Sequence, residues 1–325
     1  MPQTTEETLL RVIGLQTHFF LRRGVVKAVD GVSFVLRKGE VLGLVGESAC
    51  GKSVTGLSIL RLVPDPPGRT VGGRILFEGE DLLLKSEREM RRMRGSRITM
   101  IQQNPDTCLN PVFRIGDQVA EGMMIHQKLK KKALWDKVLE MLRLVKIASA
   151  EVRMFDYPHQ MSGGMRQRVA GAIALACQAS LLIADEPTTN LDVTTQMEYL
   201  KLLEEIQRIT GTAIIFITHD FGIVARICDR VAVMYAGKIV ETGSTEDIMG
   251  KPMHPYTIAL LESVPRPGSR GAYLRSIEGQ PPDPLELPSH CSFAVRCSSA
   301  KERCFKEIPT EAERGDQHYV SCFYE

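Results

Sequence analysis

The chain has 325 residues, 43% of them hydrophobic, and a formal net charge of +2 at pH 7. This length suits one α/β domain of about 250 residues and a smaller appended segment. The small net charge argues against a nucleic-acid partner, and the basic residues near 91–94 and 128–132 carry no interleaved aromatics, so we interpret them as solvated helix faces. No apolar run approaches the ~18 residues of a membrane span, and residues 1–7 lack a basic-then-apolar signal. We expect a cytoplasmic protein that reaches a membrane only through a partner.

The apolar pattern predicts a mainly parallel sheet flanked by helices, preceded by an antiparallel sheet near the N-terminus. The expected strands span residues 8–20, 26–37, 41–46, 74–78, 97–103, 181–186, 213–218 and 230–242. The expected helices span residues 52–63, 115–149, 162–178, 192–210 and 220–228.

A glycine-rich segment follows the apolar run 41–45 and precedes a stretch with helical spacing. This context is typical of a loop whose backbone N–H groups surround nucleotide phosphates, whose lysine reaches the terminal phosphates and whose hydroxyl binds Mg²⁺. The alternative, an ordinary glycine-rich turn, is disfavoured by the motifs that follow. We assign nucleotide binding to Gly46, Glu47, Ser48, Ala49, Cys50, Gly51, Lys52, Ser53 and Val54, with Lys52 also catalytic and Ser53 a magnesium ligand.

Two acidic residues end a second apolar run, 181–184. Such a run is typical of a parallel strand buried on both faces, although a strand that ends in a solvated turn has the same local pattern. Beside a phosphate loop, we expect Asp185 to bind Mg²⁺ and Glu186 to polarise a water near the terminal phosphate.

A Ser-Gly-Gly turn, Ser162-Gly163-Gly164-Met165, precedes another helical stretch, with Ser162 placed as its N-cap. A helix N-terminus of this kind attracts phosphate, so it is a second anion site. At this point the chain resembles, over nearly its whole length, the ATP-binding subunits of ABC transporters. The turn matches their signature motif, with Met165 where many members carry Gln.

The resemblance implies further roles for single residues. Gln103 matches a glutamine that contacts Mg²⁺ and the attacking water, and His219 matches a switch histidine near the γ-phosphate. The loop Thr189-Asn190-Leu191-Asp192 resembles one that crosses a dimer interface, where Asp192 helps to bind nucleotide. Phe19 stands where an aromatic residue stacks on adenine, although an aromatic in a strand is as often a core residue.

Two positions depart from the pattern of the family. Ala49-Cys50 replaces the usual Gly-Ser, and Asn190 replaces a smaller residue. If position 49 requires a positive φ, alanine costs on the order of 1 kcal/mol there. We expect nucleotide binding to survive this strain.

The resemblance also implies a mechanism and a division of the chain. Residues 8–262 would form the ATPase domain, with a helical subdomain at about 104–160, and residues 263–325 an extension. ATP would be held between two such domains, from a homodimer or a paralogous partner. Its hydrolysis would drive two membrane permease subunits at the cytoplasmic face of the membrane, supplied by an extracytoplasmic binding protein.

Two segments resemble the oligopeptide and dipeptide importers in particular. They are Met253-His254-Pro255-Tyr256-Thr257 and Ile277-Glu-Gly-Gln-Pro-Pro-Asp-Pro284. Nickel importers share these features, so nickel import is the alternative, and a soluble ABC ATPase or a redox-responsive regulatory module are further hypotheses. Residues 107–111 and 183–189 also resemble the peptide branch, so we favour peptide import over nickel import. The single, complete set of hydrolytic motifs argues against the other two hypotheses.

Four cysteines lie close together near the end of the chain: Cys291, Cys297, Cys304 and Cys322. A short segment with few large apolar residues is expected to need a cross-link. The spacings are wider than those of paired-cysteine zinc sites, and a cytosolic location argues against disulfides. Zinc and other uses of the thiols remain open. The resemblance implies a [4Fe–4S] cluster, because some peptide importers carry one here.

Overall fold

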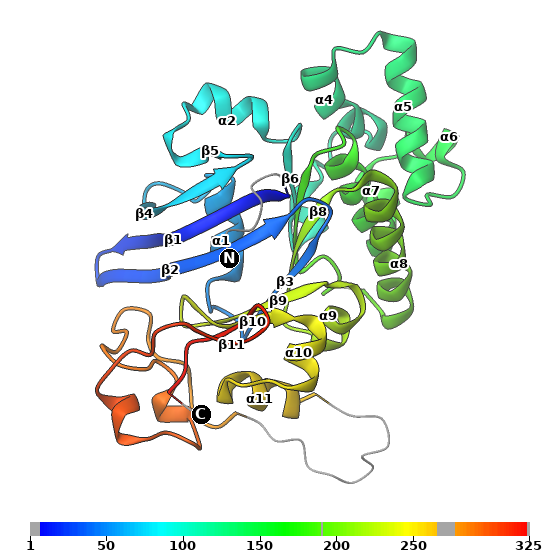
Figure 1. Ribbon diagram of the computed structural model, residues 1–325. Coiled ribbons are helices and arrows are strands. Elements are labelled where there is room, and N and C mark those ends of the chain that lie inside the picture. Colours follow the sequence, from blue (N-terminus) through cyan, green and yellow to red (C-terminus); the bar gives the residue numbers. More distant parts are fainter. Residues whose placement is uncertain (1–6, 190, 265–276, 324–325) are drawn as a thin grey trace. The chain divides into compact units, whose positions relative to one another are not determined.

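The computed structural model describes residues 7–189, 191–264 and 277–323 (Figure 1). The chain divides into two compact units: the first contains residues 1–36, 41–84 and 217–325, and the second contains residues 37–40 and 85–216. Across the described ranges, no helix combines the length and the apolar character that a bilayer crossing requires.

The first unit contains the N-terminal strands, the chain around the glycine-rich loop and the C-terminal extension. Its elements are β1 (Thr8–Leu21), β2 (Gly24–Arg37, the last residue of which belongs to the second unit), β3 (Val41–Val45), α1 (Lys52–Ile59), β4 (Gly68–Phe77), β5 (Glu80–Asp81), η1 (Leu82–Leu84), α9 (Phe221–Ile227), β9 (Arg230–Tyr235), β10 (Lys238–Ser244), α10 (Thr245–Gly250), α11 (Pro255–Glu262), η3 (Ala294–Arg296), η4 (Glu302–Phe305), β11 (Ala312–Gly315) and β12 (His318–Val320).

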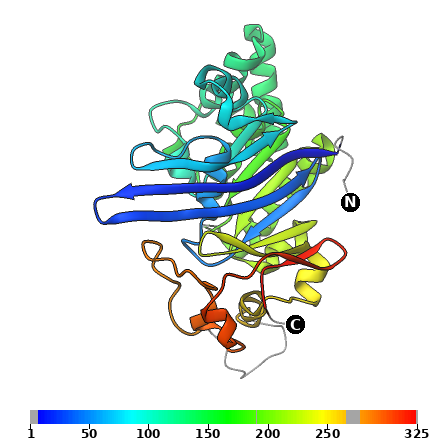
Figure 2. The ribbon, with the colours of Figure 1, turned by 60° about the vertical axis from the view of Figure 1, so that its left-hand side comes forward.

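The predicted antiparallel N-terminal sheet is confirmed, with strand order β2-β1-β4-β5. β1 and β2 are long neighbouring strands, which Figure 2 shows side by side. Leu10, Val12, Leu15 and Thr17 of β1 are buried, and the alternation breaks where the β1–β4 register shifts between Ile13 and Gln16. The shift restores the alternation of buried and less buried side chains, so that Leu15 and Thr17 continue the covered face.

The second sheet of this unit has the order β11-β12-β10-β9-β3. β3 is buried along its whole length and pairs with β9 in parallel, as expected for a core strand. The single strand predicted for 230–242 is wrong, because Ala236 and Gly237 have φ of 47° and 79° and turn the chain back into β10. Two consecutive positive φ values are typical of a tight hairpin.

The C-terminal strands join this sheet through β12, which pairs with β10. Beneath this pairing, the carboxylate of Glu241 is 1% exposed and accepts three hydrogen bonds. His318 Nε2 lies 2.8 Å from it, the Met253 N–H 2.7 Å and the His254 N–H 3.1 Å. A buried carboxylate requires such partners, so Glu241 fastens the extension to the core of the unit.

The second unit contains the predicted two-acid strand and most of the helices. Its elements are α2 (Glu87–Met93), β6 (Ile98–Ile101), α3 (Pro105–Cys108), α4 (Ile115–Gln127), α5 (Lys131–Leu144), α6 (Ala150–Arg153), η2 (Pro158–Gln160), α7 (Gly163–Leu175), β7 (Leu181–Asp185), α8 (Val193–Thr210) and β8 (Ala213–Thr218, the end of which continues into the first unit).

Parallel pairing of β6 with β7 confirms the predicted parallel character of the sheet. The continuous helix predicted for 115–149 is wrong. Lys128 has a φ of 53° and ends α4, and α5 begins only after the extended residue Lys130. The two helices pack on each other because each buries one apolar face, which includes Met123 on α4 and Val138 on α5.

Candidate nucleotide-binding site

The glycine-rich loop connects β3 to α1 and requires glycine at two positions. Gly46 has a φ of 152°, and a Cβ atom there would lie 2.2 Å from the carbonyl oxygen of Met234. Gly51 has a φ of 109°, and a Cβ atom there would lie 2.3 Å from the carbonyl oxygen of Ala28. No other residue fits these contacts without displacing backbone. The spacing of the two glycines thus reflects packing as well as the conformation of a phosphate-binding loop.

Lys52 is the first residue of α1, and its side chain bends back over the loop. The ammonium donates to the carbonyl oxygens of Gly46 at 2.8 Å and Glu47 at 2.9 Å, and Lys52 is only 5% exposed. Ser53 and Val54 follow in the first helical turn. The helix ends at Ile59, short of the predicted residue 63. The structure therefore places a cation and a helix N-terminus at the loop, which is the donor set that binds phosphate.

The unusual pair Ala49-Cys50 has the predicted strained geometry. Ala49 adopts a φ of 64°, which is the left-handed region that costs an alanine on the order of 1 kcal/mol. Ser48 and Ala49 are exposed, whereas Cys50 is buried. The carbonyl of Cys50 accepts from the Gly237 N–H at 3.0 Å, and burial raises the pKa of its thiol. Cys50 is therefore a neutral packing residue beneath the loop.

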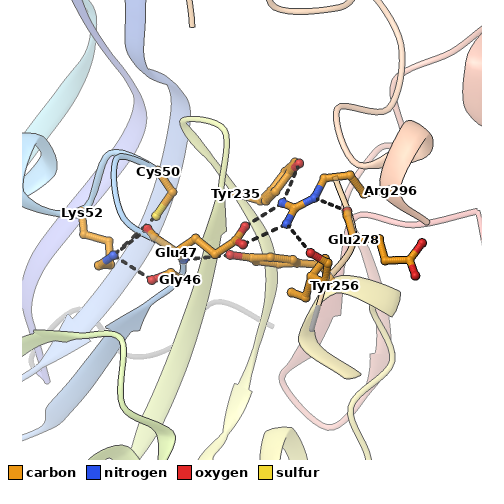
Figure 3. A network of polar contacts seen from close by, with 9 residues as sticks. Gly46, Glu47, Cys50, Lys52, Tyr235, Tyr256, Glu278 and Arg296 are labelled. Carbon is orange, nitrogen blue, oxygen red and sulfur yellow. Dashed lines mark hydrogen bonds and ion pairs between the residues drawn. The ribbon is translucent and has the colours of Figure 1, made fainter. Parts of the chain in front are cut away.

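Glu47 makes contacts that the sequence did not predict. Its carboxylate forms an ion pair with Arg296, 2.7 Å away, and its backbone N–H donates to the hydroxyl of Tyr256 at 2.8 Å (Figure 3). Tyr256 comes from a segment that the sequence marked by family resemblance, and Arg296 comes from the cysteine-rich segment. No local signal in the sequence connects them with the loop.

Two further predicted site residues, Phe19 and His219, belong to the first unit. Phe19 on β1 lies opposite Gly68 on β4, and a Cβ atom on Gly68 would lie 2.8 Å from the Phe19 ring. The ring is half-buried against this glycine. His219 directly follows β8 and is exposed, while Asp220 beside it caps α9. Their roles toward adenine and the γ-phosphate remain predictions.

The second unit holds the predicted acidic pair at the end of β7. Asp185 is buried, and Glu186 has a φ of 44° in the turn that follows. Glu186 Oε2 accepts from Gln103 Nε2 at 3.0 Å and from Thr189 Oγ1 at 2.9 Å. The structure thus brings together Gln103 and Glu186, which lie 83 positions apart in the sequence.

The Ser-Gly-Gly turn opens α7 as predicted. Ser162 Oγ accepts from the Met165 N–H at 3.3 Å, and Gly163 begins the helix. A Cβ atom on Gly164 would lie 2.8 Å from the side chain of Thr195. A glycine at this position therefore lets α7 and the start of α8 approach each other closely.

Asp192 caps α8 by accepting from the Thr195 N–H at 3.0 Å and its hydroxyl at 2.7 Å. The Thr195 N–H and hydroxyl also lower the pKa of Asp192, so it stays ionised. Asn190, the second departure from the family pattern, lies outside the described residues.

The four cysteines of the extension line one small cavity of about 10 Å³, together with Phe293 and Phe323. Four thiols around one space are the donor set of an iron–sulfur or zinc site. As the side chains stand, the cavity is about the size that admits one water molecule. Among the residues that the structure describes, no three His, Cys, Asp or Glu side chains are grouped to hold a metal ion, and no disulfide joins the cysteines. The predicted [4Fe–4S] centre therefore gains no support from the geometry.

Comparison with known proteins agrees with the predicted fold class. The ABC transporter family matches residues 29–189. A dimeric ATP-binding cassette solved in a post-hydrolysis state with ADP and phosphate aligns with a TM-score of 0.66 at 21% identity, over 73% of this chain and 99% of that chain. A cassette from the ABC transporter complex cbiONQ of Clostridium perfringens aligns with a TM-score of 0.65 at 29% identity, over 75% of this chain and 92% of that chain. The protein is thus an α/β ATPase of the ABC class, as its sequence predicted.

Close relatives extend over almost the whole chain. A probable peptide ABC transporter ATP-binding protein of Sinorhizobium fredii is 51% identical over 98% of this chain and 95% of its own. The dipeptide transport ATP-binding protein DppD of Bacillus subtilis is 50% identical over 98% and 95%, respectively. The family "Oligopeptide/dipeptide transporter, C-terminal region" matches residues 240–304. The chain belongs to the oligopeptide/dipeptide family of ABC transporter ATP-binding proteins.

Proposed function

We propose that this protein binds and hydrolyses ATP to drive the import of dipeptides or oligopeptides. The observation that carries the proposal is the loop between β3 and α1. Gly46 and Gly51 let its backbone pack closely against neighbouring backbone, and the ammonium group of Lys52 lies against the loop. The near-full-length relatives named for dipeptide and oligopeptide transport support the choice of substrate. Nickel import stays the alternative, because the sequence markers are shared with nickel importers.

The predicted catalytic and metal-binding residues would then act on one nucleotide. Lys52 and the N–H groups of the loop would balance charge that develops on the terminal phosphate. Glu186 would orient and polarise the attacking water, and its hydrogen bond from Gln103 supports that role by fixing the carboxylate. Ser53, Asp185 and Gln103 would hold Mg²⁺, which supplies positive charge to the phosphates. Phe19 would stack on adenine, and His219 would contact the γ-phosphate.

The remaining residues would serve a second copy of the ATPase. Ser162, Gly163, Gly164 and Met165 present the N-terminus of α7 to an anion, and the position of Ser162 as N-cap supports this role. Asp192 would act in the loop that crosses the interface. We propose a homodimer or a pair with a paralogous ATPase, bound to two permease subunits at the cytoplasmic face of the membrane.

We propose a division into an ATPase domain at 8–262, with a helical subdomain at about 104–160, and an extension at 263–325.

We also propose a [4Fe–4S] cluster for the extension, with zinc as the alternative. The resemblance to peptide importers that carry such a cluster supports this proposal. The four thiols line one cavity, and their side chains would have to move apart to hold a shared ligand. An absorbance spectrum of anaerobically purified protein, with iron and zinc analysis, tests this against a Cys291→Ser variant. Colourless protein without iron or zinc would remove the metal proposal.

The function is tested with Glu186→Gln in the full chain, assembled with its membrane partners. We expect nucleotide binding to persist and ATP hydrolysis and peptide uptake to be lost, because an uncharged amide cannot polarise the attacking water. Glu140→Gln is the matched control, since this exposed carboxylate pairs with Lys137 at the surface. Hydrolysis near the wild-type rate in Glu186→Gln would remove Glu186 from its role. Uptake of nickel but not peptide by the unmodified transporter would favour the alternative substrate.

A further inference from the structure

A buried arginine of the cysteine-rich extension pairs with the phosphate-binding loop. Arg296 is the last residue of the short helix η3, between Cys291 and Cys297, and its side chain is 4% exposed. Its two terminal nitrogens lie 2.7 and 2.9 Å from the two carboxylate oxygens of Glu47 (Figure 3). A bidentate pair of this kind is strong and fixes the direction of both side chains.

The other hydrogen-bonding positions of Arg296 are also satisfied. Its guanidinium donates to the Tyr235 hydroxyl at 3.3 Å, to the Glu278 carbonyl at 3.1 Å and to the Ile277 carbonyl at 3.5 Å. An arginine has five N–H donors, and all five have an acceptor here. The side chain is therefore held in one position by the extension and presented to Glu47.

The backbone of Glu47 is anchored from the same side. Its N–H donates to the Tyr256 hydroxyl, and Tyr256 is fully buried. The rings of Tyr235, Tyr256 and Phe293 pack against one another with centroids 4.6 to 5.3 Å apart. Phe293 precedes η3 and also lines the cavity of the four thiols. One aromatic cluster thus extends from the cavity, at Phe293, to the start of the loop, at Glu47.

The charge of Glu47 explains why such an anchor is needed. Glu47 directly follows Gly46, in a loop that is proposed to hold a triphosphate. A carboxylate at this place repels the bound anion unless a cation neutralises it. Lys52 contacts Glu47 at its backbone carbonyl oxygen, whereas Arg296 contacts the side-chain carboxylate of Glu47.

We propose that Arg296 is a positioning residue for nucleotide binding. It neutralises Glu47 and holds the start of the phosphate-binding loop, which makes the cysteine-rich extension a part of the nucleotide site. This inference rests on the proposed function of the loop.

The test measures the affinity of purified full-length protein for a fluorescent ATP analogue in the presence of Mg²⁺. In Arg296→Met, the partly exposed carboxylate of Glu47 stands beside the loop without its cation, and we expect the affinity to fall about tenfold. In the double variant Arg296→Met/Glu47→Gln, the uncompensated charge is gone, and we expect most of this loss to be recovered. A purely structural role of Arg296 does not predict that recovery.

Arg296→Lys and Arg303→Lys form a matched pair of controls. Lysine keeps the charge at position 296 but cannot form two parallel hydrogen bonds, so we expect a loss between wild type and Arg296→Met. Arg303 lies in the same extension and pairs with Glu307, but it is 62% exposed, so its exchange should leave the affinity unchanged. If Arg296→Met is unstable, Arg296→Lys still decides the question.

Two outcomes would overturn the inference: an affinity of both Arg296 variants within twofold of wild type, or a double variant no tighter than Arg296→Met. Lys52→Ala separates this failure from a failure of the proposed site. If Lys52→Ala binds as wild type does, the loop is not the nucleotide site. If it does not bind while the Arg296 variants do, only the role of Arg296 is wrong.

Discussion

Lowering the pH should destabilise this protein through His254, the N-cap of α11. The ring is 2% exposed, and its Nδ1 accepts the Tyr256 N–H at 3.0 Å. Burial lowers the pKa of His254 from its ordinary value of 6.5 to about 4. A proton added at Nδ1 would also displace the Tyr256 N–H, which acts in the same direction.

The sign of the effect follows from the two protonation states. Between pH 6.5 and 4 the unfolded chain binds a proton at this position and the folded chain does not, so stability is present above pH 6.5 and falls as the pH drops. From pH 7 to pH 5 the free energy of unfolding should decrease by about 2 kcal/mol through this group. That is a large part of a typical total of about 5–15 kcal/mol.

The measurement is urea unfolding followed by circular dichroism at pH 7 and pH 5, for the wild type and His254→Asn. Asparagine keeps an N-cap acceptor but does not titrate, so this variant should lack about 2 kcal/mol of the pH dependence. His159→Asn makes the same exchange at an exposed histidine and should behave as the wild type. Equal pH dependence in the wild type and His254→Asn would refute the reasoning.

Three further substitutions test the contacts of the core and the loop. Gly51→Ala forces a Cβ atom to within 2.3 Å of a carbonyl oxygen at a φ of 109°, so binding of the fluorescent ATP analogue should be lost; unchanged affinity would show that the loop adapts. His318→Ala leaves Glu241 buried with only two backbone donors and should lower the free energy of unfolding by about 3 kcal/mol, measured in urea; a loss below about 1 kcal/mol would contradict the buried pair. Tyr256→Phe removes the acceptor of the Glu47 N–H and should cost about 1 kcal/mol of unfolding free energy in the same assay, whereas an unchanged value would mean that this hydrogen bond is replaced.

The elements that the sequence predicted well are those with a strong local pattern. The bounds of the apolar strands β3, β7 and β8 and of the helices α7, α8 and α9 lie within three residues of the expected ranges. Boundaries set by backbone conformation were missed, because a positive φ at Lys128 or Ala236 leaves little trace in the pattern of apolar residues. These residues break a predicted helix and a predicted strand.

The sequence by itself determined the chemical groups of the site. The glycines, Lys52 and the acidic pair can be recognised from residues that are neighbours in the sequence, since a phosphate-binding turn is built from consecutive residues. The tertiary structure alone decided how the extension meets that turn. Arg296 and Glu47 are 249 positions apart, and His318 and Glu241 are 77 apart, so neither pair has a local signature. Both contacts exist because packing removes polar side chains from water, and these side chains then require partners.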